Sequence, residues 1–147
     1  MFIDRVEVSF DAAHRLLGYD GKCASPHGHT YRAELFVGRA HLDDLGLAID
    51  FGEIKRPLKR WIDAHWDHAF LLNDRDDLLI EALQVIPESK LYCFPGLNPS
   101  AEVMAQTLSC VMRAQLGDSL LRVRIWEAGQ YADYVLQEGN TDEGEHI

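Results

Sequence analysis

One short segment, Cys23 to His29, carries one thiol and two imidazoles, which are groups that bind metal ions and move protons. In an extended strand, side chains two residues apart point to the same side, so His27 and His29 can both present their rings to one metal ion. Gly28 between them leaves the opposite side of the strand empty. The spacing therefore indicates a metal site where a loop runs into a strand.

Two strands are predicted to position these rings. Residues 2–14 alternate between apolar and polar side chains, and His14 falls on the apolar parity. Residues 31–37 alternate in the same way, and their apolar parity extends back to His27 and His29. If the two strands pair antiparallel through the intervening loop, His14 lies beside His27 and His29 on one face. Parity alone thus predicts a cluster of three histidines.

The rest of the sequence predicts further helices and strands in an α+β order. A helix follows Asp50, and its regular part is expected to begin at Pro57 because proline inside a helix costs about 3 kcal/mol. The further elements expected are a short helix at 76–84, a short strand at 90–94, a long helix at 100–116, and strands at 121–127 and 131–137. Residues 1–138 are expected to form one domain, followed by an acidic C-terminal tail at 139–147.

Composition and charge exclude several classes of protein. The chain has 147 residues, of which 47% are apolar and 26% charged, and these values are typical of one globular domain. Its net charge of −10 repels nucleic acid, and no apolar run is long enough to cross a membrane. The N-terminus lacks the pattern of a signal peptide, and the three widely spaced cysteines do not suggest a disulfide framework. We therefore expect a cytoplasmic protein that binds neither nucleic acid nor membrane.

Three neutral imidazoles suit zinc. A catalytic zinc site uses three protein ligands and keeps the fourth position open, whereas a structural site is closed. Cys23 leaves both alternatives open. It could be the fourth ligand of a structural site, or it could be a base or nucleophile beside the metal, because a nearby cation or imidazole makes a thiol more acidic.

Three ionisable side chains stand apart from the histidines in the sequence. Asp67 next to His68 could orient that imidazole and form a proton relay. Glu127 ends an otherwise apolar strand face, where a carboxylate needs a partner. One carboxylate can bind the amidine edge of a purine-like ring through two hydrogen bonds. The alternative for Glu127 is an ion pair with Arg124 or Arg122, although their parity points them to the other face.

Six motifs taken together resemble one enzyme family. They are F-x-A-A-H (Phe10 to His14), C-x3-H-G-H (Cys23 to His29), I-D-F-G-E-I-K (Ile49 to Lys55), D-H (Asp67 and His68), N-P-S-A-E (Asn98 to Glu102) and W-E (Trp126 and Glu127). In order and spacing they look like the 6-pyruvoyltetrahydropterin synthase and 6-carboxytetrahydropterin synthase family. The resemblance covers nearly the whole sequence.

The resemblance implies both a fold and an assembly. The fold would be the tunnelling fold (T-fold), in which a four-stranded antiparallel sheet carries two long helices on one face. The protein would form a ring-like homo-oligomer, a hexamer by family resemblance, with its sites between subunits.

The resemblance also implies a metal and a substrate. Zinc would bind His14, His27 and His29, and Cys23 would be the general base. The substrate would be 7,8-dihydroneopterin triphosphate, whose side-chain hydroxyls would sit on zinc while Cys23 moves protons.

The remaining site residues receive their roles from the same resemblance. His68 and Asp67 would act as the relay of the general base. Glu127 would anchor the pterin and could also join the relay, and Ser100 and Glu102 would contact the substrate.

Loop length favours one branch of the family. The three residues between Cys23 and His27 resemble the bacterial 6-carboxytetrahydropterin branch, which serves queuosine and other deazapurine pathways. We therefore predict a zinc-dependent carbon-oxygen lyase that makes 6-carboxytetrahydropterin. The alternatives are an enzyme that makes 6-pyruvoyltetrahydropterin, and a non-catalytic protein with a closed zinc site that includes Cys23. The sequence departs from the family in having P-S-A-E at 99–102, where P-T-S-E is common, and in a longer segment at 75–97 that could reshape the pocket rim.

Overall fold

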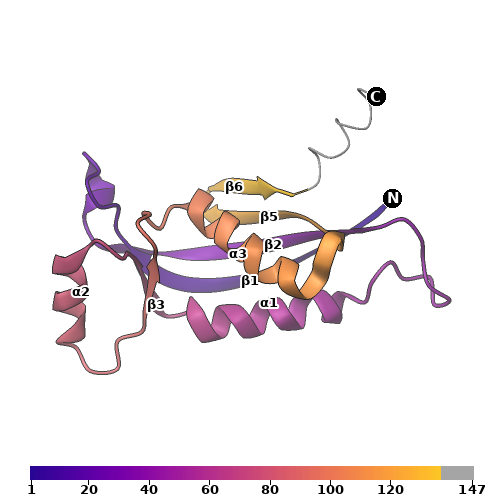
Figure 1. The fold of residues 1–147 in the computed structure, drawn as a ribbon, viewed down its shortest axis with the longest axis horizontal. Coiled ribbons are helices and arrows are strands. Elements are labelled where there is room, and N and C mark those ends of the chain that lie inside the picture. Colours follow the sequence, from indigo (N-terminus) through magenta and orange to yellow (C-terminus); the bar gives the residue numbers. More distant parts are fainter. Residues whose placement is uncertain (137–147) are drawn as a thin grey trace.

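The computed structural model describes residues 1–136, which form a curled sheet and three α-helices (Figure 1). The strands are β1 (Phe2–His14), β2 (His27–Arg39), β3 (Ala69–Asn73), β4 (Leu91–Phe94), β5 (Leu120–Glu127) and β6 (Gln130–Val135). The helices are α1 (Phe51–His65), α2 (Asp77–Gln84) and α3 (Ala101–Leu116), with the short 3₁₀ helices η1 (Lys22–Ala24) and η2 (Gly117–Ser119). The predicted α+β class is confirmed.

The hairpin of β1 and β2 lies at the centre of the sheet. The two strands pair antiparallel, with Phe10 opposite Tyr31 and His14 opposite His27. This register places the apolar parities of both strands on one face, as the sequence predicted. His14 and His27 therefore lie together at the end of the hairpin where the backbone turns.

The sheet has six strands in the order β4-β3-β1-β2-β5-β6. The strands β1, β2, β5 and β6 are antiparallel and form the predicted four-stranded sheet. The short strands β3 and β4 extend it at the β1 edge, and they run parallel to β1 and to each other. The sequence does not predict β3 as a strand, because its five residues are mostly buried and show no alternation that would separate a strand from a short buried turn.

Helix α1 begins earlier than predicted. It runs without interruption from Phe51 through Pro57, so the expected start of the regular helix at Pro57 is wrong. Its N-terminus is capped by Asp50, whose side chain accepts a hydrogen bond from the Gly52 amide at 2.7 Å. Three large apolar side chains of α1 are fully buried on the sheet, namely Ile54, Leu58 and Ile62. Burying three such side chains contributes about 5 to 9 kcal/mol, which exceeds the cost of about 3 kcal/mol for an internal proline.

Both long helices cover the same face of the sheet. Helix α1 packs against β1, while α3 packs against β5 and β6. Side chains of the two helices and the apolar parity of the central strands form the core, whose largest buried members include Tyr31, Leu35, Leu58, Trp66, Leu108 and Met112. The predicted arrangement of two long helices on one face is confirmed.

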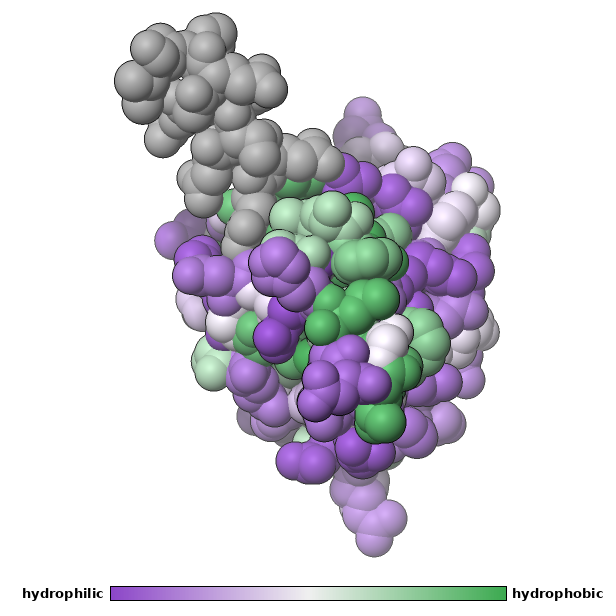
Figure 2. All heavy atoms as spheres, turned by 90° about the vertical axis from the view of Figure 1, so that its right-hand side faces the viewer, coloured by the Kyte–Doolittle hydropathy of each residue, from purple (hydrophilic) through white to green (hydrophobic). Residues whose placement is uncertain are grey.

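Exposed apolar side chains gather at the end of the molecule where β1 begins (Figure 2). The exposed members are Phe2, Ile3, Leu42, Leu45, Leu47 and Phe51. A groove of about 400 Å³ runs between the first residues of β1 and the loop that leads into α1. Apolar patches of this kind often mark a protein interface. This end of the sheet is the one farthest along β1 from His14.

The end of the predicted domain and the predicted acidic tail at 139–147 lie outside the described residues. Within residues 1–136, none of the helices has the length and apolar character needed to cross a membrane.

The longer segment at 75–97 forms α2 and β4, and an ion pair ties it to the end of β1 that carries His14. Asp76 is 2% exposed and caps α2 by accepting a hydrogen bond from the Leu79 amide. The guanidinium of Arg15, the residue after His14, binds the same carboxylate, with Nε 2.6 Å from Oδ2. These hydrogen bonds from Arg15 hold the pKa of Asp76 below its usual value.

We predict that Asp76→Asn lowers the free energy of unfolding by about 1 to 3 kcal/mol at pH 7, the usual value of hydrogen bonds to a charged group. Because the pKa of Asp76 is lowered by folding, its contribution is complete above the ordinary pKa of about 3.9 and disappears as the pH falls through the lowered value. Denaturant melts of both proteins at pH 7 and near pH 3 should therefore show a difference that shrinks in acid. Asp77→Asn, at an exposed position one residue away, should cost less. An equal cost for both variants, or a difference independent of pH, would contradict this assignment.

Candidate metal centre and adjoining cavity

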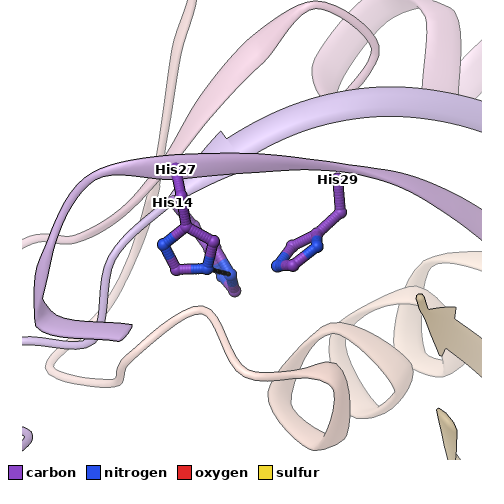
Figure 3. Close-up of side chains that lie close together, drawn as sticks. All are labelled: His14, His27 and His29. Atoms are coloured by element: carbon purple, nitrogen blue, oxygen red, sulfur yellow. Dashed lines mark hydrogen bonds between the residues drawn. The ribbon is translucent and has the colours of Figure 1, made fainter. Parts of the chain in front are cut away.

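Three imidazoles converge on the covered face of the hairpin (Figure 3). His14 is the last residue of β1, and His27 and His29 lie at the start of β2. One ring nitrogen from each residue lies within 4.8 Å of the other two, and the Nε2 atoms of His14 and His27 are 3.2 Å apart. The structure thus brings together the three histidines that the strand parity predicted to lie on one face.

Two backbone carbonyls orient these rings. Nδ1 of His14 donates to the carbonyl of Pro99 at 2.8 Å, and Nδ1 of His27 donates to the carbonyl of Ser25 at 2.7 Å. A ring nitrogen that faces a carbonyl carries the proton, so Nε2 of each ring keeps its lone pair. Partners of this kind are common behind metal-binding histidines because they fix the tautomer and the ring orientation.

Burial favours the neutral form that a metal requires. His14 is 2% exposed, and its burial lowers its pKa below the ordinary value. Nε2 of His29 is buried and has no hydrogen-bond partner among residues 1–136. A buried polar atom without a partner is costly, and a metal ion at the centre of the cluster would remove that cost. The donor set and its orientation therefore fit a divalent metal ion bound by three Nε2 atoms.

A cavity of about 180 Å³ adjoins the cluster. It is lined by His14, Leu16, Cys23, Ser100, Ala101, Glu102, Glu127, Gln130, Tyr131 and Ala132. The cavity therefore brings Cys23 and three other predicted site residues beside one of the imidazoles. Among residues 1–136, the possible metal ligands that lie within 4.8 Å of one another are those of His14, His27 and His29. Cys23 is not a member of this group. This arrangement favours an open metal site with a thiol nearby over a closed site.

Glu127 lies at the end of β5, opposite Tyr31 of β2. Its Oε1 is 3.4 Å from Nε2 of His14 and accepts a hydrogen bond from the Tyr31 hydroxyl at 3.4 Å. Burial and the charge of Glu127 raise the pKa of Tyr31 above its ordinary value, so this hydroxyl remains a donor. Arg124 instead binds Asp133 on the other face, at 2.7 Å from Nε to Oδ1. Glu127 therefore faces the metal cluster and the cavity, and its alternative pairing with this arginine does not form.

Ser100 and Glu102 lie at the N-terminus of α3. The Ser100 hydroxyl accepts a hydrogen bond from the Val103 amide at 3.2 Å and so caps the helix. Glu102 stands in the first turn, where a carboxylate is stabilised by the helix dipole. Both residues line the cavity, and each also has a role in the helix that needs no substrate.

The structure does not bring Asp67 and His68 to this cavity within one subunit. They lie after α1, beside a larger cavity of about 570 Å³ whose lining includes His68 together with Asp11, Thr30 and Lys90. Asp11 and Thr30 belong to the parity of the hairpin that faces away from the core, so this second cavity opens on the other side of the strands. The side chain of His68 is 78% exposed, and its ring faces solvent beside the hairpin.

The pair itself is held in place by hydrogen bonds. Nδ1 of His68 is 3.0 Å from Oδ2 of Asp67, and Oδ1 of Asp67 accepts from the Asp11 amide at 3.1 Å. Burial alone would raise the pKa of Asp67, but these hydrogen bonds outweigh burial and hold it below its usual value. His68 has a φ of 59°, a strained value for a residue with a side chain, and its amide donates to the Asp11 carbonyl at 2.7 Å. The fold thus holds an exposed imidazole on an ionised carboxylate.

Several residues of the site were not predicted. Pro99 and Ser25 contact the histidines through their backbone carbonyls. Because every residue has this group, the residue type does not indicate such a contact. Gln130 and Tyr131 line the cavity because the β5–β6 hairpin places Gln130 directly opposite Glu127. That pairing could have been found by extending the strand alternation through the turn at 128–129.

Comparisons with the sequences of known proteins converge on one family. Residues 5–136 match the family described as 6-pyruvoyl tetrahydropterin synthase. The 6-carboxy-5,6,7,8-tetrahydropterin synthase of Rickettsia felis is 38% identical over 101 residues, which are 69% of this chain and 72% of that protein. The protein of the same name from Haemophilus influenzae is 34% identical over 134 residues, which cover 86% of this chain and 93% of that protein.

Solved structures share the fold. The 6-pyruvoyl tetrahydropterin synthase of Caenorhabditis elegans aligns with a TM-score of 0.65 at 22% identity, covering 93% of this chain and 98% of that protein. An uncharacterized protein from Wolinella succinogenes aligns with a TM-score of 0.73 at 18% identity, covering 93% of this chain and all of that protein. These likenesses confirm the predicted tunnelling fold.

We predict that the metal-free protein binds one equivalent of Zn²⁺ and becomes more resistant to thermal unfolding. At free zinc 100 times the dissociation constant, the stabilisation should be about 2.7 kcal/mol. His29→Gln, which removes the unpartnered Nε2, should weaken binding by about 100-fold or more and abolish most of this shift. The control is His65→Gln, at an exposed position on α1. Zinc binding by His29→Gln as tight as by the unaltered protein would contradict the three-histidine site.

Proposed function

The chain belongs to the 6-pyruvoyl tetrahydropterin synthase family, and on that premise we propose that it is a zinc-dependent 6-carboxy-5,6,7,8-tetrahydropterin synthase acting on 7,8-dihydroneopterin triphosphate. The observation that carries the proposal is the cluster of three converging imidazoles beside a cavity walled by a thiol and a carboxylate. Relatives named for this activity, at 34% and 38% identity, support the choice of product. So does the short spacing from Cys23 to His27.

Zinc suits the donor set, since three imidazoles with a free fourth position are typical of catalytic zinc. Held by Nε2 of His14, His27 and His29, it would supply a Lewis acid to the side-chain hydroxyls of the substrate. The backbone carbonyls take the Nδ1 hydrogen bonds of His14 and His27, and burial lowers the pKa of His14. The same carbonyls hold the rings in place before substrate arrives.

Cys23 is the proposed general base. It lies in η1 and lines the cavity together with His14 and Glu127, so its sulfur can reach a substrate bound between them. Its task would be to take a proton from a carbon of the substrate's side arm and to return it elsewhere on the substrate.

The proposed reaction balances with one water. Triphosphate leaves from the end of the substrate's side arm as its C–O bond breaks, and acetaldehyde carries away two carbons of that arm after a C–C bond breaks. The remaining carbon becomes the carboxyl group, and the two electrons that it gives up reduce the dihydropterin ring to the tetrahydropterin. The sequence of steps needs proton transfers at several atoms but no external oxidant or reductant.

Glu127 is the proposed anchor of the pterin ring. Its carboxylate is about one-third exposed to the cavity and is held by Tyr31 from behind. Two carboxylate oxygens can accept the N–H and amino hydrogens of the pterin edge. Glu102 and Ser100, on the α3 side of the same cavity, are the proposed further contacts of the substrate.

The relay pair is best explained by self-association. Asp67 and His68 lie away from Cys23 within one subunit, yet His68 is exposed beside an open cavity of about 570 Å³. We propose that a second copy in a ring-like homo-oligomer, a hexamer by family resemblance, brings its His68 to the cavity that holds Cys23. The apolar groove at the start of β1 supports self-association as well. A role in the queuosine pathway and a location in the cytoplasm belong to the same proposal.

Product analysis tests the proposed reaction. We expect the zinc-loaded protein to convert 7,8-dihydroneopterin triphosphate into acetaldehyde, triphosphate and 6-carboxytetrahydropterin, measured by trapping the aldehyde and by mass spectrometry of the pterin. Release of triphosphate without acetaldehyde would identify a 6-pyruvoyltetrahydropterin synthase instead. Formation of neither pterin product would contradict the proposal.

Replacing Cys23 separates the catalytic from the structural role of the thiol. We predict that Cys23→Ala keeps its zinc and loses about 10²- to 10⁴-fold in kcat, the usual contribution of a general base. Cys110→Ala, which removes an exposed thiol on α3, should retain full activity and zinc. Loss of zinc from Cys23→Ala would favour the closed, non-catalytic site.

A further inference from the structure

We propose that Asn98 is a positioning residue that sets the loop carrying Cys23 relative to the three histidines. The proposal rests on the proposed function in one respect, namely that Cys23 acts as the base. Asn98 does not contact the substrate and acts on the segment between β1 and β2, residues 15–26, which we call the Cys23 loop.

The side chain of Asn98 binds both polar backbone groups of one residue in this loop. Its Oδ1 accepts a hydrogen bond from the Leu17 amide at 2.9 Å, and its Nδ2 donates to the Leu17 carbonyl at 3.0 Å. The side-chain amide of Asn98 thus makes the two hydrogen bonds to Leu17 that the backbone of a paired strand would make in a sheet. Two hydrogen bonds to one residue fix its orientation as well as its distance.

The other side of Asn98 is fixed to the sheet. Its Oδ1 also accepts from Nδ2 of Asn73 at 3.2 Å, and Asn73 ends β3 and is only 7% exposed. The Oδ1 of Asn73 accepts from the Arg75 amide at 3.0 Å, which defines the direction of its own amide group. Asn98 therefore links the Cys23 loop to a buried residue of the sheet.

Pro99, the residue after Asn98, binds the ring of His14, one of the three proposed metal ligands. The carbonyl of Pro99 accepts from Nδ1 of His14, so residues 98 and 99 contact the Cys23 loop and the histidine cluster in succession. The Asn98 side chain and the Pro99 carbonyl belong to consecutive residues. A shift in the hydrogen bonds to Leu17 would therefore change the distance between the loop and His14 directly.

The position of Leu17 is transmitted to Cys23 within the loop. The Leu16 amide donates to the Cys23 carbonyl at 2.9 Å, which joins the outgoing and returning limbs of the loop. Arg15 with Asp76 fixes the beginning of the loop, and Ser25 with His27 fixes its end. The pair of hydrogen bonds from Asn98 ties Leu17, in the outgoing limb of the loop, to the segment before α3 and to β3.

Cys23 can act as a base only if its sulfur is held at the right distance from the substrate. A base must stand within about 3 Å of the group whose proton it removes. A displacement of about 1 Å can cost about 100-fold in rate. Cys23 lies in a single turn of 3₁₀ helix without a buried residue, so that turn alone does little to hold it. Asn98 supplies the rigidity that the turn lacks.

The test uses Asn98→Asp, which keeps the size and the accepting oxygen but replaces the donor to the Leu17 carbonyl by a second acceptor. Gln115→Glu, at an exposed position on α3, makes the same chemical change and the same change of charge. In the zinc-loaded proteins we would measure zinc affinity, kcat and KM, and the rate at which iodoacetamide alkylates Cys23, followed by mass spectrometry of that residue.

We expect Asn98→Asp to keep zinc affinity within about 3-fold, to raise Cys23 alkylation about 10-fold as the loop opens, and to lower kcat about 100-fold with little change in KM. A residue that only stabilises the fold would lower the melting temperature and leave kcat and alkylation of the folded protein unchanged. Alkylation and kcat within about 2-fold of the unaltered protein would overturn the proposal. Should the unaltered protein show no synthase activity, the proposed function fails, and the alkylation rate still decides whether Asn98 positions Cys23.

Discussion

The pairing register of β1 with β2 is the constraint on which the site depends. It places His14 opposite His27 and Ala12 opposite His29, so that the three rings share the face covered by the helices. A slip by one residue would turn one strand's rings to the opposite face, because side chains alternate along a strand. The apolar side chains of the same parity prevent this slip, since they would leave the core with the histidines. The packing of the core and the geometry of the metal cluster are thus enforced by the same alternation.

The site holds one buried imidazole, that of His14, and two half-buried ones, and backbone groups bind two of the three rings. The carbonyls of Pro99 and Ser25 take the Nδ1 protons of two rings, and the lone pairs left on Nε2 point to a common centre. The third ring, that of His29, leaves a buried nitrogen that a metal ion would satisfy. Loops therefore determine the chemistry of residues that strands bring together. In our proposal Asn98 has the same kind of role for Cys23, because it holds the loop that carries the thiol.

Much of this arrangement could be predicted from the sequence, and the parts that could not share a physical cause. Strict alternation identified the hairpin, the cluster of histidines and the side of the strand on which Glu127 lies. Strand β3 was not foreseen, because a strand this short and this buried shows no period, whereas the short strand expected at 90–94 is present as β4. The helix through Pro57 was not expected, because local propensity does not include the burial of Ile54, Leu58 and Ile62. The carbonyl contacts to the histidines and the place of His68 beyond the hairpin depend on tertiary packing, which residue types alone do not encode.

The central claim is that three histidine nitrogens form an open metal site beside, but not including, Cys23. X-ray absorption at the zinc edge of the zinc-loaded protein tests this claim most directly. The structure predicts three nitrogen scatterers at about 2.0 to 2.1 Å with one light atom from solvent, the usual geometry of a three-histidine catalytic site. A sulfur scatterer at about 2.3 Å that disappears in Cys23→Ala would show a closed site and contradict the account.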